Sequence, residues 1–466
     1  MKYNTEVINE IASLLAEMLK NSILAEATSE AGTVKIAQVE TSLREVLRQI
    51  GNQTLSNFLS SQQTTPMAEL KCGCGGLLHY QRQREATVIS VFGKTIYTRP
   101  YYAGCTCQRG KAPLDEELGL EPGAVTAGLA VLLALAGIGH SYDQSPRWLQ
   151  SFLLFSVSEN TVRSETEYLG QLQAEQEKVL IEQSQKESYL QERLRQPGKI
   201  PTRLYGSIDA AKVRIEPRPR KGELPEKSEA WRDMKALCWF ETESVPAAQR
   251  SVRQKKKVDR EQVALRAKNK QYFCDILEAE AFGKLLWATG CTVKADFCPD
   301  LVFLGDGATW IWNLVEKYYP QARQIVDWYH AEEHLETVAM SAFLALPERA
   351  RWLAETTQAL WDGQVEDVIT ACQVLSKACL AAEQAVTYFT NNCERMRYAQ
   401  FRAAGYMIGS GTIESACKQI VTQRLKLPGA QWTVTGAVQT AKARAVWLSD
   451  QWPALCYLRG TLPLAA

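Results

Sequence analysis

Three acidic residues stand where a carboxylate could hold a metal ion. Asp209 lies in the apolar run 203–213, Asp306 follows the apolar run 301–305, and Glu414 lies in a glycine-rich segment that leads into a helix. An acid in an apolar strand needs a partner, and a divalent cation is one. Two cations about 4 Å apart can clamp the oxygens of an in-line phosphoryl displacement. The alternative is that the aspartates cap turns and that Glu414 is solvated.

Two closely spaced cysteine pairs could bind zinc. Their members are Cys72, Cys74, Cys105 and Cys107. Residues 87–98, between the pairs, are expected to form two strands joined at Gly93-Lys94. Four thiolates around one tetrahedral ion would stabilise such a small zinc-ribbon-like unit. One residue separates the members of each pair, whereas two are usual. His79 therefore stays open as a replacement ligand, and free thiols remain the alternative.

A third pattern is His330-Ala-Glu-Glu-His334, which places two histidines on one helix face. It fits an inverted zinc-peptidase motif in which Glu414 would be the third ligand. The alternative is two histidines in a polar helix near the core. The peptidase hypothesis leaves Asp209 and Asp306 without a role.

These residues must be positioned by an α/β core, because strands and helices alternate from residue 201 onward. The predicted strands are 203–213, 234–240, 301–308 and 324–327, and the predicted helices are 278–288, 310–319 and one from about 330. In open α/β sheets, sites form at the carboxyl ends of strands. Asp209 and Asp306 are expected at that edge.

A helix-turn-helix is predicted before this core. An apolar helix follows Pro146, Ser158 supplies a turn and an N-cap, and a second helix carries Arg163. Arg163 would then contact DNA. The alternative is a plain helical hairpin.

The composition is that of a soluble globular protein of about three domains. Of 466 residues, 23% are charged and 46% hydrophobic, which excludes a disordered tail protein or a disulfide-dense mini-protein. Thirteen cysteines without an N-terminal apolar run indicate a reducing, cytoplasmic setting with no signal peptide. The most apolar window, 124–139, is shorter than the roughly 20 residues of a membrane span, so no membrane partner is expected.

The charge is unevenly distributed. Lys and Arg number 53 against 52 Asp and Glu, and the net charge of +1 alone counts against a nucleic-acid partner. However, basic residues are concentrated at 250–270, and residues 415–449 contain no acid. The average therefore conceals a basic face that could hold phosphates.

Several motifs occur in the order seen in one family. They are Phe303-Leu-Gly-Asp306-Gly-Ala-Thr-Trp-Ile-Trp312, Ile325-Val-Asp327-Trp-Tyr-His330-Ala-Glu-Glu-His334-Leu335, Gly409-Ser-Gly-Thr-Ile-Glu414-Ser-Ala-Cys-Lys418 and Gln423-Arg-Leu-Lys426. From about residue 70 to 450 the chain resembles the bacterial insertion-sequence DDE transposases of the ISKra and ISLre kind.

The resemblance implies a multidomain α/β (α+β) fold with an RNase H-like catalytic core around a mixed sheet. Asp209, Asp306 and Glu414 would form the triad that holds Mg²⁺ or Mn²⁺. Asp327 and His330 would support the site or the DNA, and Lys418, Arg424 and Lys426 would face phosphate. The expected segments are 1–62 (helical), 67–120 (zinc-ribbon-like), 121–170 (helix-turn-helix), 171–198 (connecting helix), 201–334 with 401–450 (catalytic core) and 335–400 (helical insertion).

The implied activity is cleavage of phosphodiesters at transposon ends and joining of the 3′-hydroxyls to target DNA. Terminal inverted repeats and target DNA would be the partners, bound by a homodimer or larger assembly in the cytoplasm, at the nucleoid. The alternatives are a non-catalytic DNA-binding repressor derived from a transposase and an RNase H-like nuclease with another substrate.

Overall fold

The computed structural model describes residues 36–62, 66–196, 198–215, 231–245, 265–409 and 416–460, with a few single positions besides. Three features of the sequence analysis lie outside the described residues. They are most of residues 1–35 of the predicted helical segment, residues 250–264 of the basic stretch, and Glu414. The chain forms two compact units, residues 1–166 with 456–466, and residues 167–455. It contains a three-stranded and a five-stranded sheet, so the expected mixed α/β class is confirmed.

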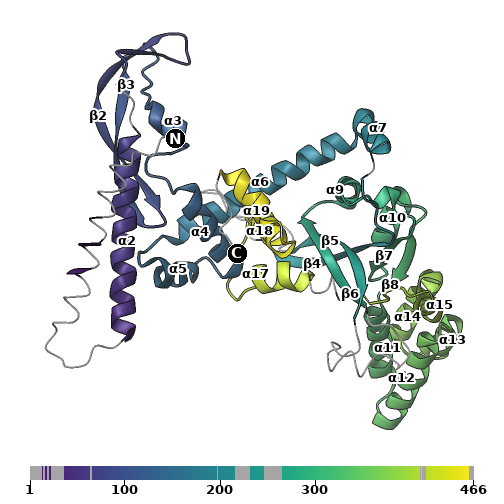
Figure 1. Cartoon of the computed structure of the whole chain (residues 1–466). Coiled ribbons are helices and arrows are strands. Elements are labelled where there is room, and N and C mark those ends of the chain that lie inside the picture. Colours follow the sequence, from purple (N-terminus) through teal and green to yellow (C-terminus); the bar gives the residue numbers. More distant parts are fainter. Residues whose placement is uncertain are drawn as a thin grey trace, which may run out of the picture. The chain divides into compact units, whose positions relative to one another are not determined.

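The first unit is built on an antiparallel sheet and one long helix (Figure 1). The strands are β1 (Glu69–Lys71), β2 (Leu77–Ser90) and β3 (Gly93–Ala103), and helix α2 (Ile36–Ser61) packs along β3. The hairpin turn is Val91-Phe92, one pair earlier than the predicted Gly93-Lys94. Arg48 of α2 donates to the Phe92 carbonyl at 2.8 Å, so the helix holds an apolar turn in place.

A buried polar group fixes helix α3 (Pro113–Leu118) on this sheet. Asp115 accepts hydrogen bonds from the Tyr97 hydroxyl at 2.6 Å and from Arg99 Nε at 2.7 Å. Leu59, Val88 and neighbouring apolar side chains form the core around them. The predicted strand pair is therefore stabilised by a small hydrophobic core of its own.

Three helices complete the unit and lead out of it. They are α4 (Ala127–Gly139), α5 (Ser145–Leu153) and α6 (Glu159–Ser184). The α6 helix is continuous across the predicted boundary at 170/171, and the break comes later, before α7 (Glu187–Arg195). Over the described part of the chain, no helix combines the length and the apolar character needed to cross a membrane.

The second unit contains a five-stranded mixed sheet in the order β6-β5-β4-β7-β8. Its strands are β4 (Leu204–Arg214), β5 (Trp231–Ser244), β6 (Leu265–Asp275), β7 (Leu301–Gly305) and β8 (Arg323–Val326). Neighbours β4, β5 and β6 pair antiparallel, whereas β4, β7 and β8 pair parallel. Four of these strands were predicted; β6 was not, because its first half lies in the basic stretch.

Helices surround this sheet. Between the strands come α9 (Ala279–Thr292), the short η2 (Ala295–Phe297) and α10 (Thr309–Tyr318). After β8 come α11 (Trp328–Ala342), α12 (Leu346–Trp361), α13 (Val365–Ser376), α14 (Leu380–Asn391), η3 (Cys393–Met396) and α15 (Tyr398–Ala403). The chain ends with a π-helical turn, η4 (Lys418–Thr422), then α17 (Gln423–Leu425), α18 (Val434–Leu448) and α19 (Trp452–Arg459). The largely helical character predicted for 335–400 is thus confirmed.

Candidate functional site

The register of the parallel strands carries three aspartates to one level. The last paired residues are Ser207 with Leu304 and Gly305 with Val326. Continued by one or two residues, this register puts Asp209 on β4, Asp306 after β7 and Asp327 after β8 at the same level. We call these three residues the acid row. Asp306 and Asp327 follow the carboxyl ends of β7 and β8, whereas Asp209 lies in the middle of the longer β4. The row therefore lies where the parallel strands β7 and β8 end, which is where α/β proteins form sites.

Asp327 is the most buried member of the row, and Asp209 and Asp306 are half-buried. The surroundings of Asp209 perturb its carboxyl group. Burial raises its pKa, and the negative charge of Asp306 raises it further. The thiol of Cys417 and the backbone N–H of Ala210 act in the opposite direction by hydrogen bonding to the carboxylate. A carboxylate that is buried beside another acid gains from a bound cation, so the donor set fits a divalent metal ion.

Asp306 is held by its own turn and by helix α14. Its Oδ1 accepts a hydrogen bond from the Ala308 N–H at 2.8 Å, and its backbone carbonyl accepts one from the Tyr388 hydroxyl at 2.9 Å. Gly307 has φ of +99°, and a Cβ there would lie 2.6 Å from the Tyr388 ring. Only glycine therefore lets α14 approach this turn so closely.

Asp327 and His330 form a pair at the start of α11. The Asp327 side chain caps the helix by accepting the His330 N–H at 2.9 Å, and His330 Nδ1 lies 3.3 Å from the same oxygen. This hydrogen bond with Asp327 raises the pKa of His330 to about 9. His330 therefore carries a positive charge at neutral pH, beside a row of acids.

His334 does not join His330 in a zinc site within the described residues. Its ring stacks on Tyr388 at 3.8 Å, and burial lowers its pKa. In that part of the chain, four cysteines make up the one group of three or more His, Cys, Asp or Glu side chains whose ligand atoms converge. The peptidase pattern thus gains no support from the geometry.

The segment after Glu414 lies beside Asp209, since Cys417 is three residues further on and contacts that carboxylate. Lys418 and Lys426 are exposed, as a phosphate contact requires. Arg424 differs from its prediction. It is 1% exposed, and its guanidinium lies 5.0 Å from the centre of the Trp432 ring. It packs inside the unit instead of facing phosphate.

The four cysteines come together as predicted. Cys72 and Cys107 sulfurs lie 3.5 Å apart, those of Cys74 and Cys105 lie 3.3 Å apart, and all four lie within 4.8 Å of one another. Zinc–sulfur bonds of about 2.3 Å in a tetrahedron place sulfurs about 3.8 Å apart. The cluster could therefore hold a zinc ion despite the short spacing within each pair.

The pKa values of two thiols in this cluster shift in opposite directions. The Cys107 N–H lowers the pKa of Cys105 to about 6. The Gly76 N–H acts in the same sense on Cys74, but hydrogen bonds with the neighbouring thiols outweigh it and raise the pKa of Cys74 to about 12. His79, the alternative ligand, lies with its Nδ1 3.2 Å from the Glu69 carboxylate, outside the group. The geometry therefore favours the four cysteines as the possible zinc ligands over a set in which His79 replaces one of them.

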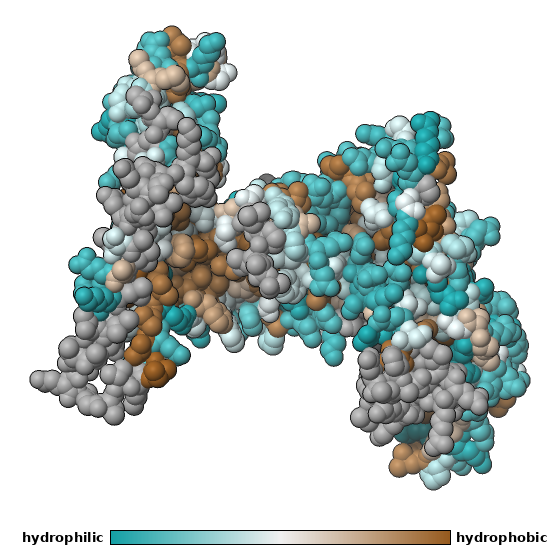
Figure 2. Space-filling model, viewed as in Figure 1, coloured by the Kyte–Doolittle hydropathy of each residue, from teal (hydrophilic) through white to brown (hydrophobic). Residues whose placement is uncertain are grey.

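The helix-turn-helix region forms as helix, turn and helix. Ser158 caps α6 as predicted, because its Oγ accepts the Thr161 N–H at 3.0 Å. Arg163 lies 2.5 Å from Glu159 and over the Tyr142 ring, so a DNA phosphate would have to replace Glu159. Apolar side chains gather over α4 and α5 on the face shown in Figure 2. Trp148 of α5 is 49% exposed.

No protein-family model matches the chain, and no curated protein is significantly similar to it. The residues themselves therefore carry the functional argument. Sequence reasoning missed three members of the site, which are Tyr388, Asn392 and Cys417. Cys417 had one available signal, its position three residues after Glu414 in the sequence.

Proposed function

We propose that the protein is a DDE-type DNA transposase that cleaves phosphodiesters at transposon ends and joins the released 3′-hydroxyls to target DNA. The observation that carries the proposal is the alignment of Asp209 and Asp306 on neighbouring parallel strands. The contact of Cys417 with Asp209 adds to it, because it brings the segment that follows Glu414 to the same place.

An RNase H-like core is part of this proposal. Its support is a mixed sheet whose first strand carries one acid and whose neighbouring parallel strand is followed by the second. The helices within residues 335–400 would be the insertion that precedes the third acid. The acid row itself supplies no converging set of three ligands within the described residues, so Glu414 is required to complete the triad.

Asp209, Asp306 and Glu414 would hold two divalent cations, Mg²⁺ or Mn²⁺, which when bound activate the attacking hydroxyl and neutralise the leaving oxygen. The protein's own contribution is placement. Tyr388 fixes the Asp306 turn, Cys417 orients the Asp209 carboxylate, and protonated His330 offsets charge beside the row. No Tyr or Ser nucleophile is needed.

Double-stranded DNA would be both substrate and target. The zinc cluster and the helix-turn-helix would bind the terminal inverted repeats, with salt-dependent contacts to phosphate. Two ends must be held together, so a homodimer or larger assembly at the nucleoid follows from the proposed chemistry.

Cleavage of the cognate ends tests this proposal. Inverted repeats sought in the DNA that flanks the gene would be built into a labelled duplex and incubated with the full-length zinc-loaded protein and Mg²⁺. Wild type should nick the repeat ends and transfer them to a target plasmid. Asp306→Asn should reduce cleavage at least about hundredfold, whereas the exposed control Asp367→Asn on α13 should leave it unchanged.

The alternatives give different results. Binding without cleavage by wild type would indicate a DNA-binding repressor, and cleavage without strand transfer would indicate a nuclease. Equal cleavage by wild type and Asp306→Asn would show that the triad assignment is wrong.

A further inference from the structure

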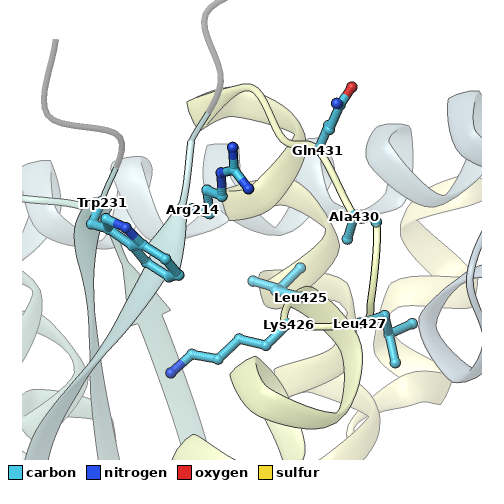
Figure 3. Close-up of a pocket in the computed structure, with 8 residues that line it drawn as sticks. Arg214, Trp231, Leu425, Lys426, Leu427, Ala430 and Gln431 are labelled. Atoms are coloured by element: carbon cyan, nitrogen blue, oxygen red, sulfur yellow. The ribbon is translucent and has the colours of Figure 1, made fainter. Parts of the chain in front are cut away.

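A cavity of about 250 Å³ opens beyond the acid row in the second unit (Figure 3). Its walls are the last residue of β4, Arg214, the first residue of β5, Trp231, and the turn of residues 425–431. Arg214 lies five residues along β4 from Asp209. At about 3.3 Å per residue, the cavity is roughly 17 Å from that acid. It is therefore separate from the metal site.

The walls of this cavity are held in place. Arg214 and Trp231 are direct partners in the β4–β5 register, so their side chains are neighbours. The turn is fixed to the end of β4 by a bridge between Ile215 and Trp432. Trp432 in turn donates from Nε1 to the Leu425 carbonyl at 2.9 Å. The guanidinium of the buried Arg424 lies over the ring of the same Trp432.

The chemistry of the walls is cationic and aromatic. Arg214 and Lys426 contribute positive charge, and the Trp231 ring is 50% exposed at the opening. Figure 3 shows Lys426 extending toward Trp231, with Arg214 between the tryptophan and the turn that carries Ala430. None of the eight lining residues, all of which the structure describes, is acidic. The nearest acid on β5, Asp233, is paired with Lys212 at 3.0 Å.

Two cations beside an exposed indole match a phosphate linked to a planar base. Guanidinium and ammonium groups bind phosphate oxygens, and aromatic rings stack on unpaired bases without regard to sequence. The ring of a paired base inside a duplex is not accessible for stacking, so the occupant must be an unstacked nucleotide. A free nucleotide and a nucleotide within a strand share this chemistry.

We propose that this cavity binds one unstacked nucleotide of a DNA strand, with its phosphate between Arg214 and Lys426 and its base on Trp231. The nucleotide-binding role stands on the cavity alone. Its place in the reaction, as a hold on single-stranded DNA near the cleaved end, rests on the proposed transposase function.

Fluorescence anisotropy with a short labelled single-stranded oligonucleotide tests the cavity without catalysis. The full-length zinc-loaded protein is used with Ca²⁺ in place of Mg²⁺. Stacking of about 1–3 kcal/mol per base predicts that Trp231→Ala weakens binding roughly five- to 150-fold. Trp231→Phe should bind nearly as wild type. Trp447→Ala is the matched control, because Trp447 is 47% exposed on α18 of the same unit.

Further measurements distinguish the contribution of the base from that of the phosphate, and a strand nucleotide from a free one. An oligonucleotide of abasic sites should remove the difference between wild type and Trp231→Ala. Lys426→Gln and Arg214→Gln should each lower the salt slope of log affinity by about one. Thymidine monophosphate should compete only weakly. Strong competition by the mononucleotide would assign the cavity to free nucleotides and overturn the strand proposal.

The two proposals can fail separately. Added to Asp306→Asn, Trp231→Ala should weaken binding by the same factor as it does in wild type, even if no variant cleaves DNA. Unchanged affinity in Trp231→Ala, with Lys426→Gln also unchanged, would overturn the nucleotide site while leaving cleavage by wild type intact. Melting temperatures of both variants that match wild type would show that any loss of affinity is local.

Discussion

The Tyr388 hydroxyl donates a hydrogen bond to the backbone carbonyl of Asp306 at 2.9 Å, across 82 residues of sequence. The same helix places Asn392 Nδ2 3.3 Å from the Gly307 carbonyl. Helix α14 therefore fixes the turn that follows β7 from the outside. The helical segment after β8 is thus more than a spacer, because it sets the position of a proposed metal ligand.

Tyr388→Phe is expected to loosen this turn without removing the ring. The lost hydrogen bond should lower the free energy of unfolding by about 1 kcal/mol. Burial raises the pKa of Tyr388 far above its usual range, so the hydroxyl remains a donor at every working pH. In the cleavage assay, the variant should need more Mg²⁺ for half-maximal rate. Tyr457→Phe, at a side chain 60% exposed, is the control and should change neither quantity.

Most strands could be predicted because they are apolar runs that are buried on both faces, as β7 is. The β6 strand was missed because Arg266, Lys268 and Lys270 interrupt any apolar pattern in its first half. Their place in the fold explains them, since β6 is an edge of the sheet and charged side chains protect strand edges from pairing with other chains. Composition alone cannot distinguish such an edge from a basic loop.

The site was predictable where chemistry follows strand ends and unpredictable where it depends on distant packing. Asp306 follows from the first rule. Asp209 does not, because it was expected near the end of its strand and lies in the middle of β4, at the level where the shorter β7 ends. Tyr388 carries no spacing signal, because only the tertiary fold brings it to Asp306. Arg424 was assigned to phosphate from its basic neighbours, yet Trp432 eight residues later covers it. A count of charges does not tell inward from outward side chains.

Zinc content should depend on the cysteine cluster. Cys105→Ser is expected to abolish stoichiometric zinc in the purified protein and to lower the melting temperature of the first unit, because metal binding stabilises small β units. His79→Ala should retain zinc, since His79 lies against Glu69. The measurement is elemental analysis by mass spectrometry together with thermal unfolding.

Cys298→Ser is the control for a general effect of removing a thiol, because Cys298 is a half-buried cysteine of the second unit. Zinc that persists in Cys105→Ser, or that is absent from wild type prepared without chelator, would contradict the assignment.

The pair of His330 and Asp327 predicts a pH dependence of stability in Mg²⁺-free protein. The hydrogen bond that the His330 ring donates to the Asp327 carboxylate raises the pKa of His330 to about 9, above its ordinary value of about 6.5. The pair's contribution is therefore complete below about pH 6.5 and is lost as the pH rises through about 9. We expect the free energy of unfolding to fall by on the order of 1–3 kcal/mol across this range.

His330→Gln should flatten this dependence when unfolding by urea is followed at several pH values. His334→Gln is the comparison, because burial lowers the pKa of His334 and its effect must appear on the acidic side instead. An identical slope between about pH 6.5 and 9 in wild type and His330→Gln would show that another group titrates.

Residues 415–449, which contain no acidic residue, include both buried and exposed lysines. Lys442 is a buried one with a structural role. Its ammonium is 2% exposed and forms ion pairs with Glu177 and with Asp275, the latter at 2.7 Å, and it also donates to the Cys274 carbonyl. Burial alone would lower its pKa, but Glu177 and Asp275 raise it, so Lys442 stays charged. These contacts join α6, β6 and α18, and they leave no ammonium proton for a phosphate.

Lys442→Ala should therefore lower the free energy of unfolding by about 3–5 kcal/mol, because two carboxylates would remain buried without a counter-charge. Lys426→Ala, at an exposed position of the same segment, should change stability by no more than about 0.5 kcal/mol. Adding Glu177→Gln to Lys442→Ala should restore part of the loss, since one uncompensated charge is removed. Urea unfolding measures all three variants. A Lys442→Ala protein as stable as wild type but weaker in DNA binding would place this lysine on the surface that meets phosphate.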